Sequence, residues 1–192
     1  YKSLHHFENN LIDNYYFLKS LILGGCRDVT VVGTCLEYGM KSGKLSESLP
    51  PEPVNAYALA KDALRRFLVE FSKESSFAFK WIRMFYLFGE GQNPNSLFAQ
   101  LERAIADNKK TFDMSGGEQV RDFLPIERAS NYLMRIATQG ESGVFNCCSG
   151  QPVKVKAFVE NLLRSKGANI ALNLGAFPYV DYEPMEFWGD NT

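Results

Sequence analysis

The sequence has little of several features that define whole classes of protein. No apolar run reaches the roughly 18 residues that a membrane-spanning helix needs. Charge of neither sign is in excess, because 21 Lys and Arg residues stand against 22 Asp and Glu residues and leave a net charge of −1. This balance gives no reason to expect nucleic acid or an anionic membrane as a partner.

Cysteine is also sparse, and its spacing excludes two further classes. The four cysteines include an adjacent pair, and no CxxC spacing occurs: Cys26, Cys35, Cys147, Cys148. Neither a zinc site nor a disulfide framework is expected from this pattern. A reduced, cytoplasmic compartment is the simpler interpretation. No signal peptide opens the chain, which starts with Tyr1 rather than Met.

What is present is an ordinary globular mixture, with 45% hydrophobic and 22% charged residues. Helical periodicity predicts helices at about 11–22, 60–71, 96–108, 125–138 and 153–166. Runs rich in β-branched and aromatic residues predict strands at 28–33, 77–85, 120–125, 144–148 and 170–174. We expect a Pro-rich loop at about 40–55, a turn at 111–117 and an irregular aromatic tail at 177–188.

Strands that alternate with helices predict an α/β fold with a doubly wound, mostly parallel sheet. The texture of the chain changes near Gly89 to Pro94. We therefore expect a sheet-forming domain over residues 1–93 and a smaller α/β lobe over 94–192.

The residues best suited to chemistry are Tyr57 and Lys61, four apart at the start of a predicted helix and so on one face. A phenol has a pKa near ~10, and a nearby cation favours its ionised form. The pair could therefore exchange a proton with a substrate hydroxyl. The alternative is a packed Tyr beside a solvated Lys. Thr34 follows a strand, where open α/β sheets place ligands, and its hydroxyl could hold the same oxygen or cap the loop.

Several segments together resemble the extended short-chain dehydrogenase/reductase family, of the nucleotide-sugar epimerase/dehydratase type. They match its motifs in order along nearly the whole chain: FENNLIDN (7–14), GTCLEYG (33–39), NAYALAK (55–61), IRMFYLFGEGQ (82–92), GEQVRDFLPIERA (117–129) and GVFNCCSGQPVKVKAFVE (143–160). The resemblance implies a Rossmann-like fold, NAD or NADP as cofactor and a nucleotide-diphosphate sugar as substrate. It also implies a homodimer built through the YxxxK helix.

The resemblance also implies roles for individual residues. Tyr57 would be the general acid/base, Lys61 would hold the nicotinamide ribose, and Thr34 would orient the sugar oxygen. Asn10 and Gly33 would lie near the cofactor. The substrate would be contacted by Tyr86, which stands where many relatives have Asn and could also simply pack, and by Arg121, which would grip the nucleotide phosphates or else pair with Asp122 or Glu127. His5 and His6 are expected at the surface.

Two departures narrow this expectation. Dehydratases of the family follow the Thr with Asp-Glu, but here Cys35 and Leu36 occupy those places, and in extended backbone Glu37 would face the other way. No His is near Cys35 in the sequence, so we do not expect a catalytic thiol. A ketoreductase or an epimerase is therefore favoured over a 4,6-dehydratase.

The other departure is the lack of the GxxGxxG turn that binds the cofactor pyrophosphate. It suggests a fragment without the N-terminal half and the extreme C-terminus, inactive and poorly soluble alone. A non-catalytic relative that binds a nucleotide sugar or a partner protein is the alternative.

Overall fold

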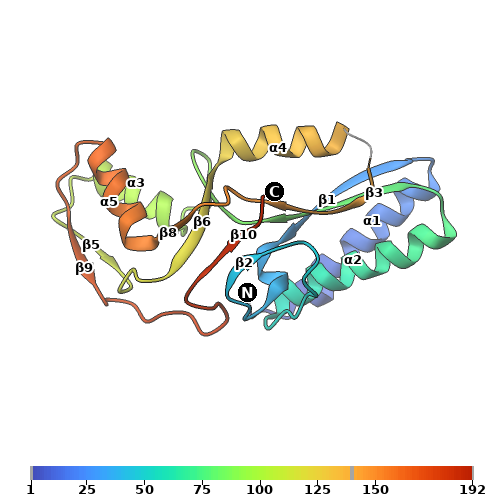
Figure 1. The fold of residues 1–192 in the computed structure, drawn as a ribbon, viewed down its shortest axis with the longest axis horizontal. Helices are drawn as coiled ribbons and strands as arrows, with labels where there is room; N and C mark the ends of the chain where they lie inside the picture. The colour runs from blue at the N-terminus through green and yellow to red at the C-terminus, as the bar shows by residue number, and fades with distance from the viewer. Residues whose placement is uncertain (1, 139–140, 192) are drawn as a thin grey trace.

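A computed structural model describes residues 2–138 and 141–191, and its centre is a parallel three-stranded sheet in the order β1-β3-β7. Strand β1 (Asp28–Thr34) pairs with β3 (Ala78–Met84), and β3 pairs with β7 (Gly143–Cys147). Helices α1 (Ile12–Leu23) and α2 (Ala56–Glu74) cover one face, and α4 (Ile126–Thr138) covers the other (Figure 1). The three strands run in the same direction, so their carboxyl ends meet at one edge.

Both faces of this sheet are packed, which explains the nearly continuous apolar composition of its strands. Trp81 and Ile82 are fully buried neighbours in β3 that point to opposite faces, as alternate residues of a strand must. Trp81 packs among residues of α1 and α2, whereas Ile82 packs against α4. The core of this half therefore consists of two layers divided by the sheet.

A second group of elements lies beside the central sheet (Figure 1). One mixed sheet contains β4 (Tyr86–Phe88), β6 (Val120–Pro125) and β8 (Pro152–Lys154), in which β6 and β8 are antiparallel. Strands β5 (Thr111–Met114) and β9 (Ala171–Leu174) pair in parallel. Residues of α3 (Leu97–Ala106) and α5 (Val155–Ser165) join those of β5 in a separate apolar core. Strand β10 (Phe187–Gly189) returns to pair with β2 (Gly43–Leu45).

The α/β fold with a mostly parallel sheet is confirmed, and some local predictions are wrong. The segment Thr111–Met114 is a strand rather than a turn, because it pairs with β9 some 60 residues away. A π-helical stretch, His6–Leu11, precedes α1, and a 3₁₀ helix, Cys35–Tyr38, follows β1. The predicted loop and the predicted tail each contain a short strand, β2 and β10.

The domain boundary near Gly89 to Pro94 stays a prediction. Strand β7 lies beyond this boundary in the sequence and still belongs to the central sheet. The ends of the two predicted ranges, Tyr1 and Thr192, lie outside the described residues, as do residues 139–140.

Candidate functional site

A cavity of about 650 Å³ opens at the carboxyl edge of the central sheet. Thr34 ends β1 and Met84 ends β3, and both side chains line this cavity. The predicted site residues Tyr57, Tyr86 and Arg121 line it as well. Parallel α/β sheets bind ligands at this edge, so the structure brings these predicted residues together at the expected place.

Tyr57 also borders a second, smaller cavity of about 160 Å³. Asn10, Lys61 and His6 line this second cavity. Tyr57 lies at the start of α2, whose N-cap residue Asn55 accepts a hydrogen bond from the backbone N–H of Ala58 at 2.9 Å. The fixed start of the helix places Tyr57 between the two cavities, with Thr34 on one side and Lys61 on the other.

Thr34 both lines the large cavity and caps the 3₁₀ helix behind it. Its Oγ1 accepts a hydrogen bond from the backbone N–H of Leu36 at 3.3 Å, while its own backbone N–H donates to Glu37 Oε1 at 2.8 Å. The hydroxyl hydrogen is not used by the cap, because Oγ1 is the acceptor there. The capping and ligand-binding readings of Thr34 are therefore compatible.

The buried side chain of Glu37 connects this turn to strand β3. Its carboxylate also accepts hydrogen bonds from Trp81 Nε1 at 3.0 Å and from Arg83 Nε at 3.0 Å, and its side chain is fully buried. Burial raises the pKa of the Glu37 carboxyl, and the Arg83 guanidinium is the main group that opposes this. Glu37 does face away from the large cavity, but the cause is the 3₁₀ turn rather than extended backbone.

Gly33 is required by this same network. A Cβ at position 33 would lie 2.2 Å from Trp81 Nε1 and 2.4 Å from Glu37 Oε1. The sequence suggested that Gly33 allows close approach of a cofactor, and that role stays a prediction. The contacts give an independent reason for a glycine, since any side chain here would break the Glu37–Trp81 hydrogen bond.

Lys61 donates a hydrogen bond from Nζ to the backbone oxygen of Val32 at 2.9 Å. Burial lowers the pKa of Lys61, and Glu37 partly opposes this. A partly desolvated ammonium acts more strongly on its neighbours than a solvated one. His6 is only partly exposed: its ring packs edge-on to the Tyr57 ring with 5.2 Å between centroids, and its Nδ1 lies 3.2 Å from Asn10 Nδ2.

Arg121 and Tyr86 converge on a residue that sequence reasoning missed, Glu183. Arg121 Nη2 donates to Glu183 Oε2 at 3.0 Å, and the Tyr86 hydroxyl donates to the same oxygen. The alternative pairing of Arg121 with Asp122 or Glu127 is wrong. The carboxylate of Asp122 instead accepts hydrogen bonds from backbone N–H groups, including those of residues 149 and 150.

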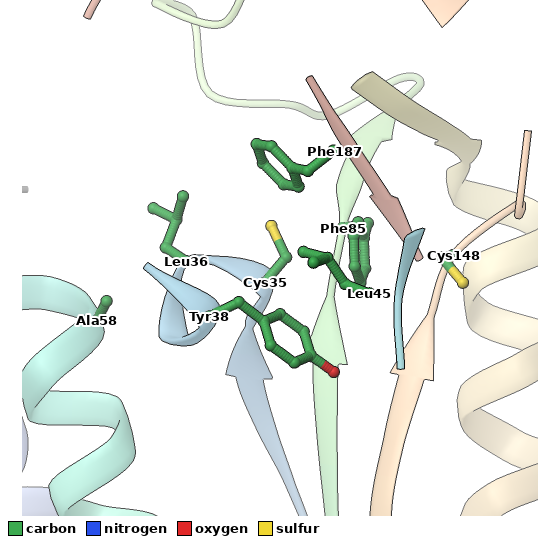
Figure 2. Packing of buried hydrophobic residues seen from close by; sticks show 8 residues of the cluster. All are labelled: Cys35, Leu36, Tyr38, Leu45, Ala58, Phe85, Cys148 and Phe187. Carbon is green, nitrogen blue, oxygen red and sulfur yellow. The ribbon is translucent and has the colours of Figure 1, made fainter. Parts of the chain in front are cut away.

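The residues next to Thr34 are apolar or neutral. Cys35 and Leu36 line the large cavity, and Cys35 belongs to a buried cluster with Phe85 and Phe187 (Figure 2). Burial raises the pKa of the Cys35 thiol, with Glu183 as the largest charged contribution in the same direction. The thiol is therefore held in its protonated form. Neither Cys35 nor Leu36 supplies the carboxylic acid that elimination of water from a sugar would need.

The geometry defines a class of α/β protein with a Tyr–Lys helix beside the carboxyl edge of a parallel sheet. Residues 2–148 match the family described as "NAD dependent epimerase/dehydratase family". The chain belongs to this family, and its extended short-chain dehydrogenase/reductase character is confirmed.

Known proteins show the same relationship. The chain is 31% identical over 182 residues to dTDP-6-deoxy-L-talose 4-dehydrogenase (NAD(+)) of Aggregatibacter actinomycetemcomitans, covering 94% of this chain and 67% of that protein. It shares its fold with UDP-N-acetylglucosamine 4-epimerase from Methanobrevibacter ruminantium M1 in complex with UDP-N-acetylmuramic acid (TM-score 0.85, 21% identity, 94% of this chain and 60% of that one). MoeE5 in complex with UDP-glucuronic acid and NAD also shares the fold (TM-score 0.80, 24% identity, 92% and 60%). The chain thus spans about two thirds or less of these relatives.

Two further findings concern the described ranges alone. No helix within residues 2–138 and 141–191 is long and apolar enough to cross a bilayer. Over the same residues, no group of three His, Cys, Asp or Glu side chains is arranged to hold a metal ion.

Proposed function

We propose that the complete protein is an NAD(P)-dependent reductase or epimerase that acts on a nucleotide-diphosphate sugar. The observation that carries this proposal is the position of Tyr57, which borders both cavities. The large cavity has the volume of a small-molecule site, and the small one offers Asn10 and Lys61. A substrate oxygen beside Thr34 and a cofactor ribose beside Lys61 would both lie next to Tyr57.

The residues of the chain suit proton transfer at this point. In reduction the Tyr57 hydroxyl would give its proton to the sugar oxygen, and in oxidation the Tyr57 phenolate would take a proton from the sugar hydroxyl. Thr34 would donate its hydroxyl hydrogen to the same oxygen and so fix its position. The Lys61 ammonium would favour the ionised form of Tyr57. The nicotinamide group, when bound, would supply or accept the hydride.

The absence of a carboxylic acid after Thr34 supports reduction or epimerisation rather than a 4,6-elimination. Cys35 and Leu36 occupy the two relevant places in the cavity wall. The two favoured reactions differ in their use of cofactor: a reductase consumes NAD(P)H in proportion to product, and an epimerase has no net consumption. Measuring cofactor oxidation against product formation separates them.

The test of the proposal is the Tyr57→Phe variant of the complete protein, assayed with NAD and NADP in turn. We expect kcat to fall by about 10²–10⁴-fold while the variant still binds cofactor, because only proton transfer is lost. Tyr132→Phe is the matched control, since Tyr132 lies on α4 and lines neither cavity. Activity of Tyr57→Phe within about twofold of wild type would count against the proposal.

We also propose a homodimer through the outer surfaces of α1 and α2. Large apolar side chains are exposed on both helices: Ile12, Tyr16, Phe17, Leu21, Leu23, Leu59 and Phe67. A monomer rarely exposes so many neighbouring apolar groups. Sedimentation of the complete protein should show a dimer, and Phe17→Asp should shift it to monomer. A wild-type monomer at micromolar concentration would contradict this proposal.

We also propose that the protein is located in the reducing cytoplasm. All four cysteines are free thiols in the structure, and three of them are buried. Fractionation of the native cells, followed by detection of the protein, tests this location directly. Recovery in an oxidising compartment would contradict it.

A further inference from the structure

The charged side chains that line the large cavity are few. Among the described residues they are Asp113, Arg121 and Glu183. The only cation of the three, Arg121, already forms an ion pair with Glu183, and the two side chains are 5% and 10% exposed. Arg121 therefore already has a counter-charge, and Glu183 places a carboxylate in the cavity wall.

We propose that Glu183 is a specificity-determining residue that selects a neutral, hydroxyl-bearing sugar and rejects a sugar that carries a carboxylate. This inference rests on the proposed function, because it concerns the sugar bound in the same cavity. Glu183 lies in the segment between β9 and β10, and it was not among the predicted site residues.

Three contacts place Glu183 at the reacting end of the cavity. Tyr86, whose hydroxyl binds Glu183, packs against the buried cluster that contains Cys35. Cys35 directly follows Thr34 and lines the cavity beside it. Phe187, seen next to Cys35 in Figure 2, packs on the Arg121 guanidinium at 4.6 Å from its ring centroid. The carboxylate thus lies close to the part of the cavity wall formed by Thr34 and Cys35, where the proposed function places the sugar.

The carboxylate is also held in a fixed position. Arg121, its partner, donates from Nη1 to the backbone oxygens of Val120 at 2.9 Å and Met185 at 3.1 Å. Within the described residues both donors to Glu183, Tyr86 and Arg121, bind Oε2, and Oε1 is the oxygen that we assign to a ligand hydroxyl. A fixed acceptor at a buried site increases the affinity for a ligand with a hydroxyl donor and lowers the affinity for a ligand without one.

A uronic acid would bring a second carboxylate to this end of the cavity. Two like charges in a partly desolvated site repel strongly, and Arg121 is already neutralised by Glu183. A nucleotide-linked hexose presents a hydroxymethyl group instead, which can donate to Oε1. The two ligands differ only at that carbon, so their affinities isolate the effect of the charge.

The experiment compares dissociation constants of the cofactor-loaded complete protein for UDP-glucose and UDP-glucuronic acid, or for the same pair carried on thymidine diphosphate. Wild type should bind the hexose at least about tenfold more tightly. Glu183→Gln keeps the shape and loses the charge, so it should reduce this ratio by roughly tenfold and leave Arg121 to attract the uronate. Glu183→Asp keeps the charge and should retain the preference.

Glu186→Gln is the matched control, because Glu186 is exposed in the same segment and does not line the cavity. Its ratio should equal that of wild type. A wild-type protein that binds both ligands within about twofold of each other overturns the inference, whether or not the variants fold. So does an unchanged ratio in a folded Glu183→Gln variant. Failure of the proposed function is distinct: the wild type would then turn over no nucleotide sugar.

Discussion

The carboxylate of Glu37 is expected to contribute more to stability than any exposed carboxylate of the chain. Glu37→Ala would remove three hydrogen-bond partners at once, from Thr34 N, Trp81 Nε1 and Arg83 Nε. The Arg83 side chain is 2% exposed, so its guanidinium would remain buried without its counter-charge. Breaking a buried pair in this way costs about 3–5 kcal/mol.

This cost corresponds to a large fall in melting temperature. One kcal/mol shifts the Tm of a domain of 150–250 residues by about 2–4 °C, so Glu37→Ala should lower it by roughly 6–20 °C. Glu70→Ala is the matched control, because it also removes a carboxylate from an ion pair on the chain, Glu70–Lys73, in which Glu70 is 71% exposed. An exposed pair of that kind contributes about 0–1 kcal/mol.

The assay is thermal unfolding of the complete protein, followed by circular dichroism and checked by urea titration. If Glu37→Ala and Glu70→Ala melt within about 2 °C of each other, the reasoning on the buried network is refuted. Because Glu37 also fixes the turn that holds Thr34, folded Glu37→Ala protein should lose activity at low temperature, where its stability is not limiting.

Three further predictions follow, one on the backbone and two on the thiols. Gly39→Ala should destabilise the protein by about 1–3 kcal/mol or more, because φ is +70° and the new Cβ would lie 1.9 Å from the Glu52 carbonyl oxygen. Gly25→Ala is the control: Gly25 also has a positive φ, but the space around it is open. In the same urea titration, Gly25→Ala should lower the free energy of unfolding less than Gly39→Ala does. Alkylation at pH 8, read by mass spectrometry, should label the half-buried Cys26 first, and equal labelling of all four thiols would contradict this. Burial raises the pKa of the Cys147 and Cys148 thiols to about 12 in the folded state. Because the unfolded chain loses these protons near pH 8.5, the folded state should lose stability as the pH rises from about 8.5 toward 12.

Local patterns in the sequence predicted the parts of the fold that local physics determines. The helix that carries Tyr57 and Lys61 has a strong apolar period and an N-cap at Asn55, and it forms as α2. Strand β1 and its final residue Thr34 were likewise visible as a β-rich run before a polar turn. These features depend on residues close in the chain, so the sequence shows them directly.

The features that sequence reasoning missed depend on residues far apart in the chain. Glu183 meets Arg121 across 62 positions, and it lies in a segment without helical or strand periodicity. Strand β5 forms only because β9 pairs with it, and its own sequence resembles a turn before two glycines. His6 reaches Tyr57 because a π-helical stretch extends the chain before α1. No local signal encodes such pairings.

Isotope transfer at the reacting carbon tests the central claim most directly. The complete protein would be incubated with cofactor and a nucleotide sugar that carries deuterium on the carbon of the reacting hydroxyl, and both products would be analysed by mass spectrometry and NMR. The account predicts that deuterium moves to the cofactor, or returns to the same carbon with inverted configuration, and that Tyr57→Phe suppresses both outcomes. Wild-type protein that leaves the label and the configuration unchanged in every nucleotide sugar tested would contradict it.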